Sequence, residues 1–199
     1  MNDFLKTVKT FLGEYGFKKR GSGFWRIENE IYYLIDFQRS SFGDYFFVNL
    51  CIHPLGLPEL VTNQLLINEK PKNYECILRQ RIEQIVSPQE FKRLNKGMLS
   101  LSDKDSIDCL FEVLSKEVIE WFNLWGSYEK LAMVDESEVM NKLTVIPLLK
   151  TKTYFLIKTY CNYRIGEIKS AKIYLQKFDD EKVDGMDFTH ITRHLANLI

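Results

Sequence analysis

The residues with the clearest chemical potential lie in one stretch near the N-terminus. Cys51 and His53 are two positions apart, and Asp36 comes shortly before them. A thiol, an imidazole and a carboxylate on one face can act as nucleophile, base and orienting group. Side chains at i and i+2 of a strand start about 7 Å apart, however, and no neighbouring residue in the sequence obviously activates the thiol. A small hydrolase or transferase that uses Asp36, Asn49, Cys51 and His53 is therefore our alternative hypothesis, second to binding.

A pair of histidines near the C-terminus has a spacing that suits a metal. His190 and His194 are one helical turn apart, so both imidazoles can reach one ion. The segment supplies no glutamate beside them and no obvious third ligand. We therefore expect an ordinary terminal helix and no metal site.

A third group combines cations with aromatic rings. Its members are Lys18, Lys19, Arg20, Trp25 and Arg26. Interleaved cations and rings can hold single-stranded nucleic acid through phosphate contacts and stacking. Lysines on a strand edge also protect against aggregation, and the chain as a whole is neutral. Nucleic-acid binding through this hairpin ranks third, and nucleic acid is not the partner we favour.

Composition excludes several other classes. The 199 residues contain 27 Lys+Arg and 27 Asp+Glu, so no global field attracts nucleic acid or acidic membranes. The four cysteines lie far apart without a C-x-x-C pair, which is typical of a reducing compartment rather than a zinc or disulfide framework. No hydrophobic signal core opens the chain, and residues 107–125 contain too many charges to span a membrane. We expect a cytoplasmic protein without cofactor or membrane contact.

The candidate residues lie on predicted antiparallel strands between residues 16 and 53. In residues 31–38 the odd positions are large and apolar, and in residues 45–52 the even positions are. A four-residue loop at 41–44 places Phe37 opposite Val48 on the core side. The reverse face then pairs Asp36 with Asn49 and also contains Gln38. We call this reverse face the mixed face, because it combines polar and apolar residues.

The turn before this hairpin allows two registers. A three-residue loop at 28–30 puts Trp25 and Ile27 in the core and Arg26 on the mixed face. A two-residue turn at 29–30 sends Phe24 and Arg26 inward instead. We prefer the three-residue loop, because it avoids burying a guanidinium without a known partner. The predicted binding residues are therefore Arg26, Asp36, Gln38 and Asn49.

This stretch resembles a known family. The segments that carry the resemblance are residues 16–19 (GFKK), 24–26 (FWR), 35–40 (IDFQRS) and 47–50 (FVNL). They are similar to domain-of-unknown-function family 4304, a bacterial family, over roughly residues 1–90. A small residue is expected after the last segment, where Cys51 stands. The resemblance implies no reaction and no catalytic residues.

Helices are predicted in the rest of the chain. One covers residues 2–15, and a short one follows Ser87. The strongest begins at Ser102 or Asp103 and continues to Trp125 with an apolar stripe that we expect to cover the sheet. Residues 60–67 and 74–86 remain open between helix and strand. From Ser127 onward we expect helices only, with an interruption at Pro147, a hairpin near Gly166 and a last helix at 188–198.

These patterns predict an α+β fold. An antiparallel meander of three to four strands packs on a long amphipathic helix, and a helical C-terminal region completes the chain. Residues 1–100 form the sheet portion and residues 101–199 the helical portion of one integrated domain. The preferred function is a non-enzymatic intracellular binding protein with a protein partner, for example an immunity or antitoxin-like protein. Three scattered histidines and the absence of a cofactor motif favour it. The oligomeric state stays open.

Overall fold

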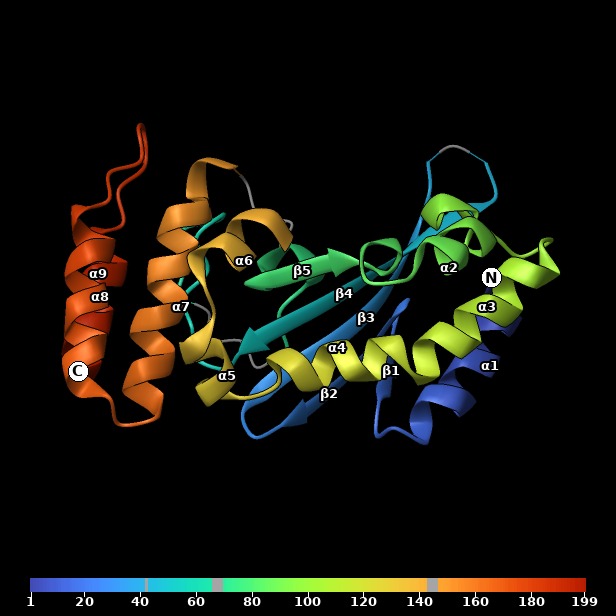
Figure 1. The fold of residues 1–199 in the computed structure, drawn as a ribbon, viewed down its shortest axis with the longest axis horizontal. Helices are drawn as coiled ribbons and strands as arrows, with labels where there is room; N and C mark the ends of the chain where they lie inside the picture. The colour runs from blue at the N-terminus through green and yellow to red at the C-terminus, as the bar shows by residue number, and fades with distance from the viewer. Residues whose placement is uncertain (42, 66–69, 143–146) are drawn as a thin grey trace. The chain divides into compact units, whose positions relative to one another are not determined.

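The chain folds as an α+β protein, as predicted (Figure 1). The computed structural model describes residues 1–41, 43–65, 70–142 and 147–199. Two compact units are present, and each contains two stretches of chain. Unit 1 consists of Met1–Ile52 and Arg79–Leu124, and unit 2 consists of His53–Leu78 and Trp125–Ile199.

Six strands in the described part of the chain form one sheet, most of which lies in unit 1. The strand order is β1-β2-β3-β4-β5, and β6 pairs with β4. The strands are β1 (Lys18–Arg20), β2 (Gly23–Glu28), β3 (Ile31–Arg39), β4 (Tyr45–Pro54), β5 (Leu78–Arg81) and β6 (Leu99–Ser100). Strands β2, β3 and β4 are the predicted meander. Strand β5 lies within residues 74–86, for which both a helix and a strand were considered.

The hairpin of β3 and β4 has the predicted register. The backbone N–H of Ser40 donates to the carbonyl of Tyr45 at 2.8 Å, so these two residues pair across the hairpin as predicted. The Asn49 side chain on β4 donates to Asp36 and Gln38 on β3. These three side chains therefore share one face, as the alternation predicts.

The turn between β2 and β3 contains two residues, so our preferred three-residue loop is wrong. Glu28 pairs with Ile31, and Asn29 and Glu30 have φ angles of 50° and 61°. A two-residue hairpin turn of this kind requires positive φ at both positions. The resulting register moves Arg26 from the mixed face to the opposite face, opposite Tyr33.

Arg26 tolerates this position because other segments supply its partners. Its Nη1 donates to the Tyr15 carbonyl at 3.1 Å, and its Nη2 lies 3.5 Å from the Glu28 carboxylate. The guanidinium also lies 5.0 Å from the Phe17 ring centre and 4.9 Å from that of Tyr33. The desolvation that we expected to oppose this register is thus offset by hydrogen bonds, an ion pair and two cation–π contacts.

The helices of unit 1 cover the face of the sheet opposite to the mixed face (Figure 1). They are α1 (Asn2–Gly13), α2 (Pro88–Arg93), α3 (Lys104–Ser115) and α4 (Glu117–Trp125), whose last residue belongs to unit 2. Phe4 of α1 packs edge-on against Phe37 at 5.7 Å between ring centres, and Phe122 of α4 packs against Tyr33 at 5.2 Å. The apolar stripe predicted for residues 107–125 thus contributes to the sheet's core.

That stripe belongs to two helices rather than one. Asp103 caps α3 by accepting from the Ser106 N–H at 3.2 Å. Lys116 then has φ −123° and ψ −76°, which end α3 and separate it from α4. Single 3-10 turns occur at η1 (Asn73–Glu75), η2 (Ile82–Gln84), η3 (Asn95–Gly97) and η4 (Pro147–Leu149).

Unit 2 is mainly helical. Its helices are α5 (Tyr128–Met133), α6 (Glu136–Lys142), α7 (Lys150–Arg164), α8 (Ile168–Asp180) and α9 (Thr189–Leu198). Helix α7 packs against the other four. Gly166, with φ 83°, makes the turn from α7 to α8, as the predicted hairpin requires.

Two segments with open predictions fall partly outside the described residues. Glu59 and Gln64 form an isolated bridge around a turn, and residues 66 and 67 are not described. Pro147 begins η4, while residues 143–146 just before it are not described. Within the described ranges, no helix is long and apolar enough to cross a membrane.

Candidate functional site

The mixed face is the sheet surface turned away from Phe37 and Phe46, and it carries more charge than the sequence indicated. Alternation along the paired strands places on it Lys18, Arg20, Gly23, Trp25, Ile27, Tyr32, Leu34, Asp36, Gln38, Phe47, Asn49, Cys51, Arg79 and Arg81. Its central strands hold a polar cluster, and each edge holds a pair of cations. Tyr32, Leu34 and Cys51 on the same face are buried.

The centre is a hydrogen-bonded cluster of three side chains. Asn49 Nδ2 donates to Gln38 Oε1 at 3.2 Å and to Asp36 Oδ2 at 3.5 Å. The Ser22 hydroxyl donates to the other oxygen of Asp36 at 3.3 Å. Asn49 is only 4% exposed, whereas Asp36 is half-buried and Gln38 is exposed. A buried amide thus holds two accessible polar side chains in fixed positions.

The first edge is strand β1. Lys18 lies directly opposite Trp25, and its ammonium is 5.6 Å from the Trp25 ring centre. Arg20 lies opposite Gly23, and both cations are exposed. A Cβ on Gly23 would come within 3.0 Å of the Leu34 side chain and 3.9 Å of Asp36 Oδ1. Glycine therefore avoids this close approach, and Gly23 is itself buried between Arg20 and Asp36.

The second edge is strand β5, whose side chains alternate between the two faces. Gln80 accepts a hydrogen bond from the Trp121 indole at 2.6 Å, so it points to the helices. Arg81 points the other way, and its guanidinium lies 4.2 Å from the Phe47 ring centre. Arg79 shares the parity of Arg81, and both are half-buried. The mixed face therefore gains two arginines at this edge.

The structure brings together three of the four predicted binding residues. Asp36, Gln38 and Asn49 form the central cluster, and Arg26 lies on the other face. Sequence reasoning missed Arg79 and Arg81, because residues 74–86 were left open between helix and strand. The alternation of apolar and polar residues in 78–81 (LRQR) is the signal that identifies them.

The alternative catalytic set is not arranged for general-base chemistry. The Ile77 N–H donates to His53 Nδ1 at 3.3 Å, which leaves Nε2 as the protonated nitrogen, donating to the Leu57 carbonyl at 3.0 Å. Burial lowers the pKa of His53 to about 4, although the bond to Leu57 opposes the shift. Cys51 is fully buried and belongs to unit 1, whereas His53 belongs to unit 2. Both ring nitrogens of His53 already hold backbone groups.

A family match covers most of unit 1 and also residues 53–78 of unit 2. The family model described as domain of unknown function DUF4304 matches residues 8–124. This chain belongs to the DUF4304 family. The resemblance expected over roughly residues 1–90 is confirmed and extends through α3 and most of α4. All residues of the mixed face lie inside the matched range. Comparisons with curated proteins and with solved structures give no match.

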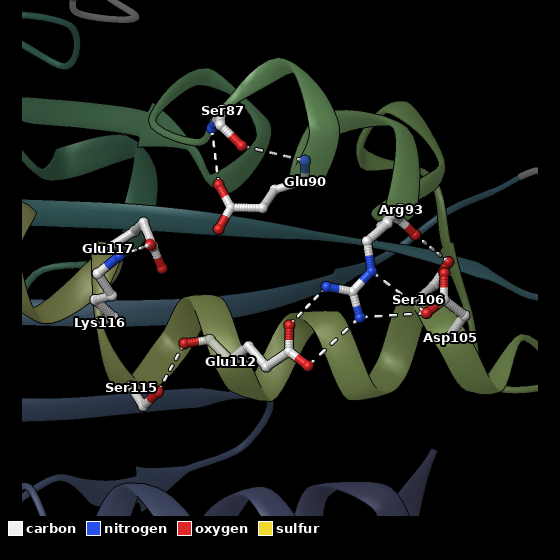
Figure 2. A network of polar contacts seen from close by, with 9 residues as sticks. All are labelled: Ser87, Glu90, Arg93, Asp105, Ser106, Glu112, Ser115, Lys116 and Glu117. Carbon is white, nitrogen blue, oxygen red and sulfur yellow. Dashed lines mark hydrogen bonds and ion pairs between the residues drawn. The ribbon is translucent and has the colours of Figure 1, made fainter.

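The DUF4304 region contains a second polar cluster, between α2 and α3 (Figure 2). The Arg93 guanidinium donates to Glu112 Oε2 at 2.6 Å and to Asp105 Oδ1 at 3.2 Å. These bonds hold the pKa of Glu112 below its usual range and raise that of Arg93. The Arg93 carbonyl accepts from the Ser106 hydroxyl at 2.7 Å. The guanidinium and the two carboxylates satisfy one another's hydrogen bonds, so the cluster links α2 to α3.

A pocket of about 330 Å³ lies at the loop end of β3 and β4. Its lining includes Arg39, Asp44, Ser100 and Ser102. Arg39 is 3.5 Å from Asp44, and the two serine hydroxyls are 2.9 Å apart. Its polar groups pair with one another, which makes it a weaker candidate than the mixed face.

The paired histidines of α9 have no metal-binding arrangement in the described residues. His190 Nε2 lies 3.1 Å from the Asn63 carbonyl, a contact within unit 2. No group of three or more His, Cys, Asp or Glu side chains that could hold a metal ion occurs among the described residues. The contact with Asn63 gives His190 a structural role.

Proposed function

We propose that this DUF4304 protein is a non-enzymatic binding protein that recognises its partner through the mixed face. The carrying observation is the Asp36–Asn49–Gln38 cluster. A sheet supports these side chains, and the buried Asn49 fixes two of them by hydrogen bonds. Polar groups held in place before binding lose little side-chain entropy when a partner arrives.

The chemistry of the rival enzyme set supports binding over catalysis. A general base needs a nitrogen within reach of the proton that it abstracts. Both nitrogens of His53 hold backbone groups, and its imidazole is fully buried. Cys51 is buried as well, so iodoacetamide should label it only after unfolding.

One concrete form of the proposal is an immunity or antitoxin-like protein that blocks a toxin in the bacterial cytoplasm. The small size of the chain, its widely separated cysteines and the absence of a cofactor motif are compatible with this role. Recognition through a rigid sheet face suits a protein that must bind one partner tightly.

Gln38→Ala is the cleanest test. Gln38 is exposed and its removal takes one hydrogen bond from Asn49, so the free energy of unfolding should fall by roughly 0.5–1.5 kcal/mol and the variant should stay folded. The tagged chain and the variant serve as baits in extracts of the native cell, and captured molecules are quantified. Gln89→Ala on α2 is the matched control, because Gln89 is an exposed glutamine away from the mixed face.

A partner that is lost with Gln38→Ala and retained with Gln89→Ala supports the proposal. Equal capture by the original chain and Gln38→Ala, with both folded at the assay temperature, contradicts it. Asp36→Ala is less suitable, because Asp36 is half-buried and its loss removes bonds to Ser22 and Asn49.

A further inference from the structure

We infer that the mixed face binds single-stranded nucleic acid. The inference rests on the proposed function of this face and names single-stranded nucleic acid, in place of a protein toxin, as its partner. The sequence disfavours nucleic acid, because the chain is neutral and the basic group lies in one hairpin. In the structure, Arg79 and Arg81 add cations from a second edge of the same sheet face.

The charge on the mixed face is strongly asymmetric. Lys18 and Arg20 lie at the β1 edge, and Arg79 and Arg81 lie at the β5 edge. The carboxylates opposed to these four cations include Asp36 on the same face and Glu83 just after β5, which interacts electrostatically with Arg81. A neutral chain that concentrates cations on one sheet face produces a local field for anions.

The aromatic residues lie beside these cations. The Lys18 ammonium lies over Trp25 near one edge, and the Arg81 guanidinium lies over Phe47 near the other. Bases stack on aromatic rings and on the planes of arginine side chains, whereas phosphates bind the adjacent charges. Each edge therefore combines a ring with a cation. Trp25 also stacks on Tyr32, with 6.2 Å between ring centres, so a base that binds at either edge shares its ring with the cation or displaces that cation.

The central cluster provides groups that can contact base edges. Gln38 and Asp36 are held between the two cationic edges by Asn49. Side-chain amides and carboxylates pair with base donors and acceptors. From β1 to β5, the face thus presents a cation beside an aromatic ring, then the polar cluster, and then a second ring beside a cation.

The width of the face matches a short strand. Strands β1 and β5 are the first and last of five neighbours. Spacings of about 4.8 Å separate them by about 19 Å. Twelve nucleotides are long enough to reach from one edge to the other even at the spacing of about 3.4 Å found in a base-stacked strand.

A direct binding assay tests the inference. Fluorescein-labelled dT12 and U12 are titrated with the full chain at 50 mM salt, and anisotropy gives Kd. We expect Kd to rise with salt, and four phosphate contacts predict a slope of log K on log salt of about −3. A labelled dA12·dT12 duplex and poly-L-glutamate competition distinguish single strands from other polyanions.

Variants assign the binding to the mixed face. Lys18→Gln and Arg81→Gln should each reduce the magnitude of the salt slope by about 0.7. Lys9→Gln on α1 removes an equal charge from an exposed lysine outside the face and should leave Kd and slope unchanged. Phe47→Leu should weaken binding by about 5- to 150-fold through lost stacking. Thermal melting of each variant confirms that it is folded.

Several results would overturn the inference. They are absence of strand binding at 50 mM salt, poly-L-glutamate competing as well as dT12 per unit charge, duplex binding as tight as single strands, and Lys9→Gln acting like Lys18→Gln. Each leaves the proposed function standing if Gln38→Ala still abolishes capture of a partner. Strand binding that no mixed-face variant alters, together with unchanged capture by Gln38→Ala, would contradict both.

Discussion

Asn49 donates its side-chain N–H to the Asp36 carboxylate across the β3–β4 pair, with 3.5 Å between Nδ2 and Oδ2. Asn49 is 4% exposed, so this amide fixes a carboxylate from below the surface. The arrangement depends on the donor, because a second carboxylate at position 49 would repel the first.

Asn49→Asp should therefore lower the free energy of unfolding by roughly 1–3 kcal/mol at pH 7. The repulsion raises the folded-state pKa of the carboxyl pair, so the folded state binds a proton more readily than the unfolded chain. The loss should shrink as the pH falls through that raised pKa. Urea unfolding of the original chain and Asn49→Asp at pH 7 and pH 4.5 measures this loss of free energy of unfolding at each pH.

Asn197→Asp is the matched control, because Asn197 is exposed near the end of α9. It should change the free energy of unfolding by less than about 0.5 kcal/mol at either pH. A loss for Asn49→Asp that is equally small at pH 7 would show that the Asn49–Asp36 bond does not organise the mixed face.

The Trp121 ring on α4 should be a main contributor to the core of unit 1. It is 6% exposed, packs 5.3 Å from Phe122, and donates to Gln80 at 2.6 Å. Trp121→Ala should lower the free energy of unfolding by roughly 3–5 kcal/mol through the cavity that it leaves. Leu124→Ala, one turn away and 56% exposed, should cost less than about 0.5 kcal/mol. Comparable losses for the two variants would contradict this role.

The β3–β4 register followed from the sequence because two independent constraints agree. Period-two alternation fixes which side of each strand is apolar, and the four-residue loop fixes the pairing. A shift by one residue would turn Phe37 to the surface and Asp36 to the core. The sequence therefore sufficed to place Asp36 beside Asn49, although it did not show that Asn49 is buried.

The position of Arg26 was not predictable from its own strand. The cost of burying a guanidinium depends on its partners. Tyr15 and Phe17 come from a preceding segment, and Glu28 and Tyr33 become neighbours only once the two-residue turn forms. The sequence of the strand alone indicates that burying Arg26 is costly, but it does not indicate the contacts that offset this cost.

Two other features were missed for different reasons. The alternation in residues 78–81 is too short to outweigh the helical propensity around it, so the sequence did not assign Arg79 and Arg81 to a face of the sheet. The stripe of residues 107–125 keeps helical spacing across Lys116, so periodicity alone did not reveal the break between α3 and α4. Pairing with β4 and packing on the sheet determine both.

His53 should make unit 2 sensitive to acid. Burial lowers its pKa from 6.5 to about 4, so the unfolded chain takes up a proton before the folded chain does. Stability from this group is present above pH 6.5 and is lost as the pH falls toward 4. Between pH 7.5 and pH 5 the loss should be about 2 kcal/mol. His53→Gln removes the titrating group.

The measurement is the difference between the two chains. Denaturant unfolding at pH 7.5 and pH 5 gives the pH-dependent loss for each, and the original chain should lose about 2 kcal/mol more than His53→Gln. The difference removes contributions from other titrating groups. An equal loss in both would show that His53 titrates alike in the folded and unfolded states, against the bonds to Leu57 and Ile77.

Lys158 on α7 should stabilise the C-terminal end of α5. It is 8% exposed, and its ammonium donates to the carbonyls of Ala132 and Val134, the latter at 3.3 Å. A cation at this end also complements the helix dipole. Lys158→Met keeps a similar stem and removes the donors, which should lower the free energy of unfolding by roughly 1–3 kcal/mol.

Lys172→Met on α8 makes the same change at an exposed position and should cost less than about 0.5 kcal/mol. Urea unfolding decides between them: a loss for Lys158→Met no larger than that for Lys172→Met would show that α5 ends stably without the ammonium.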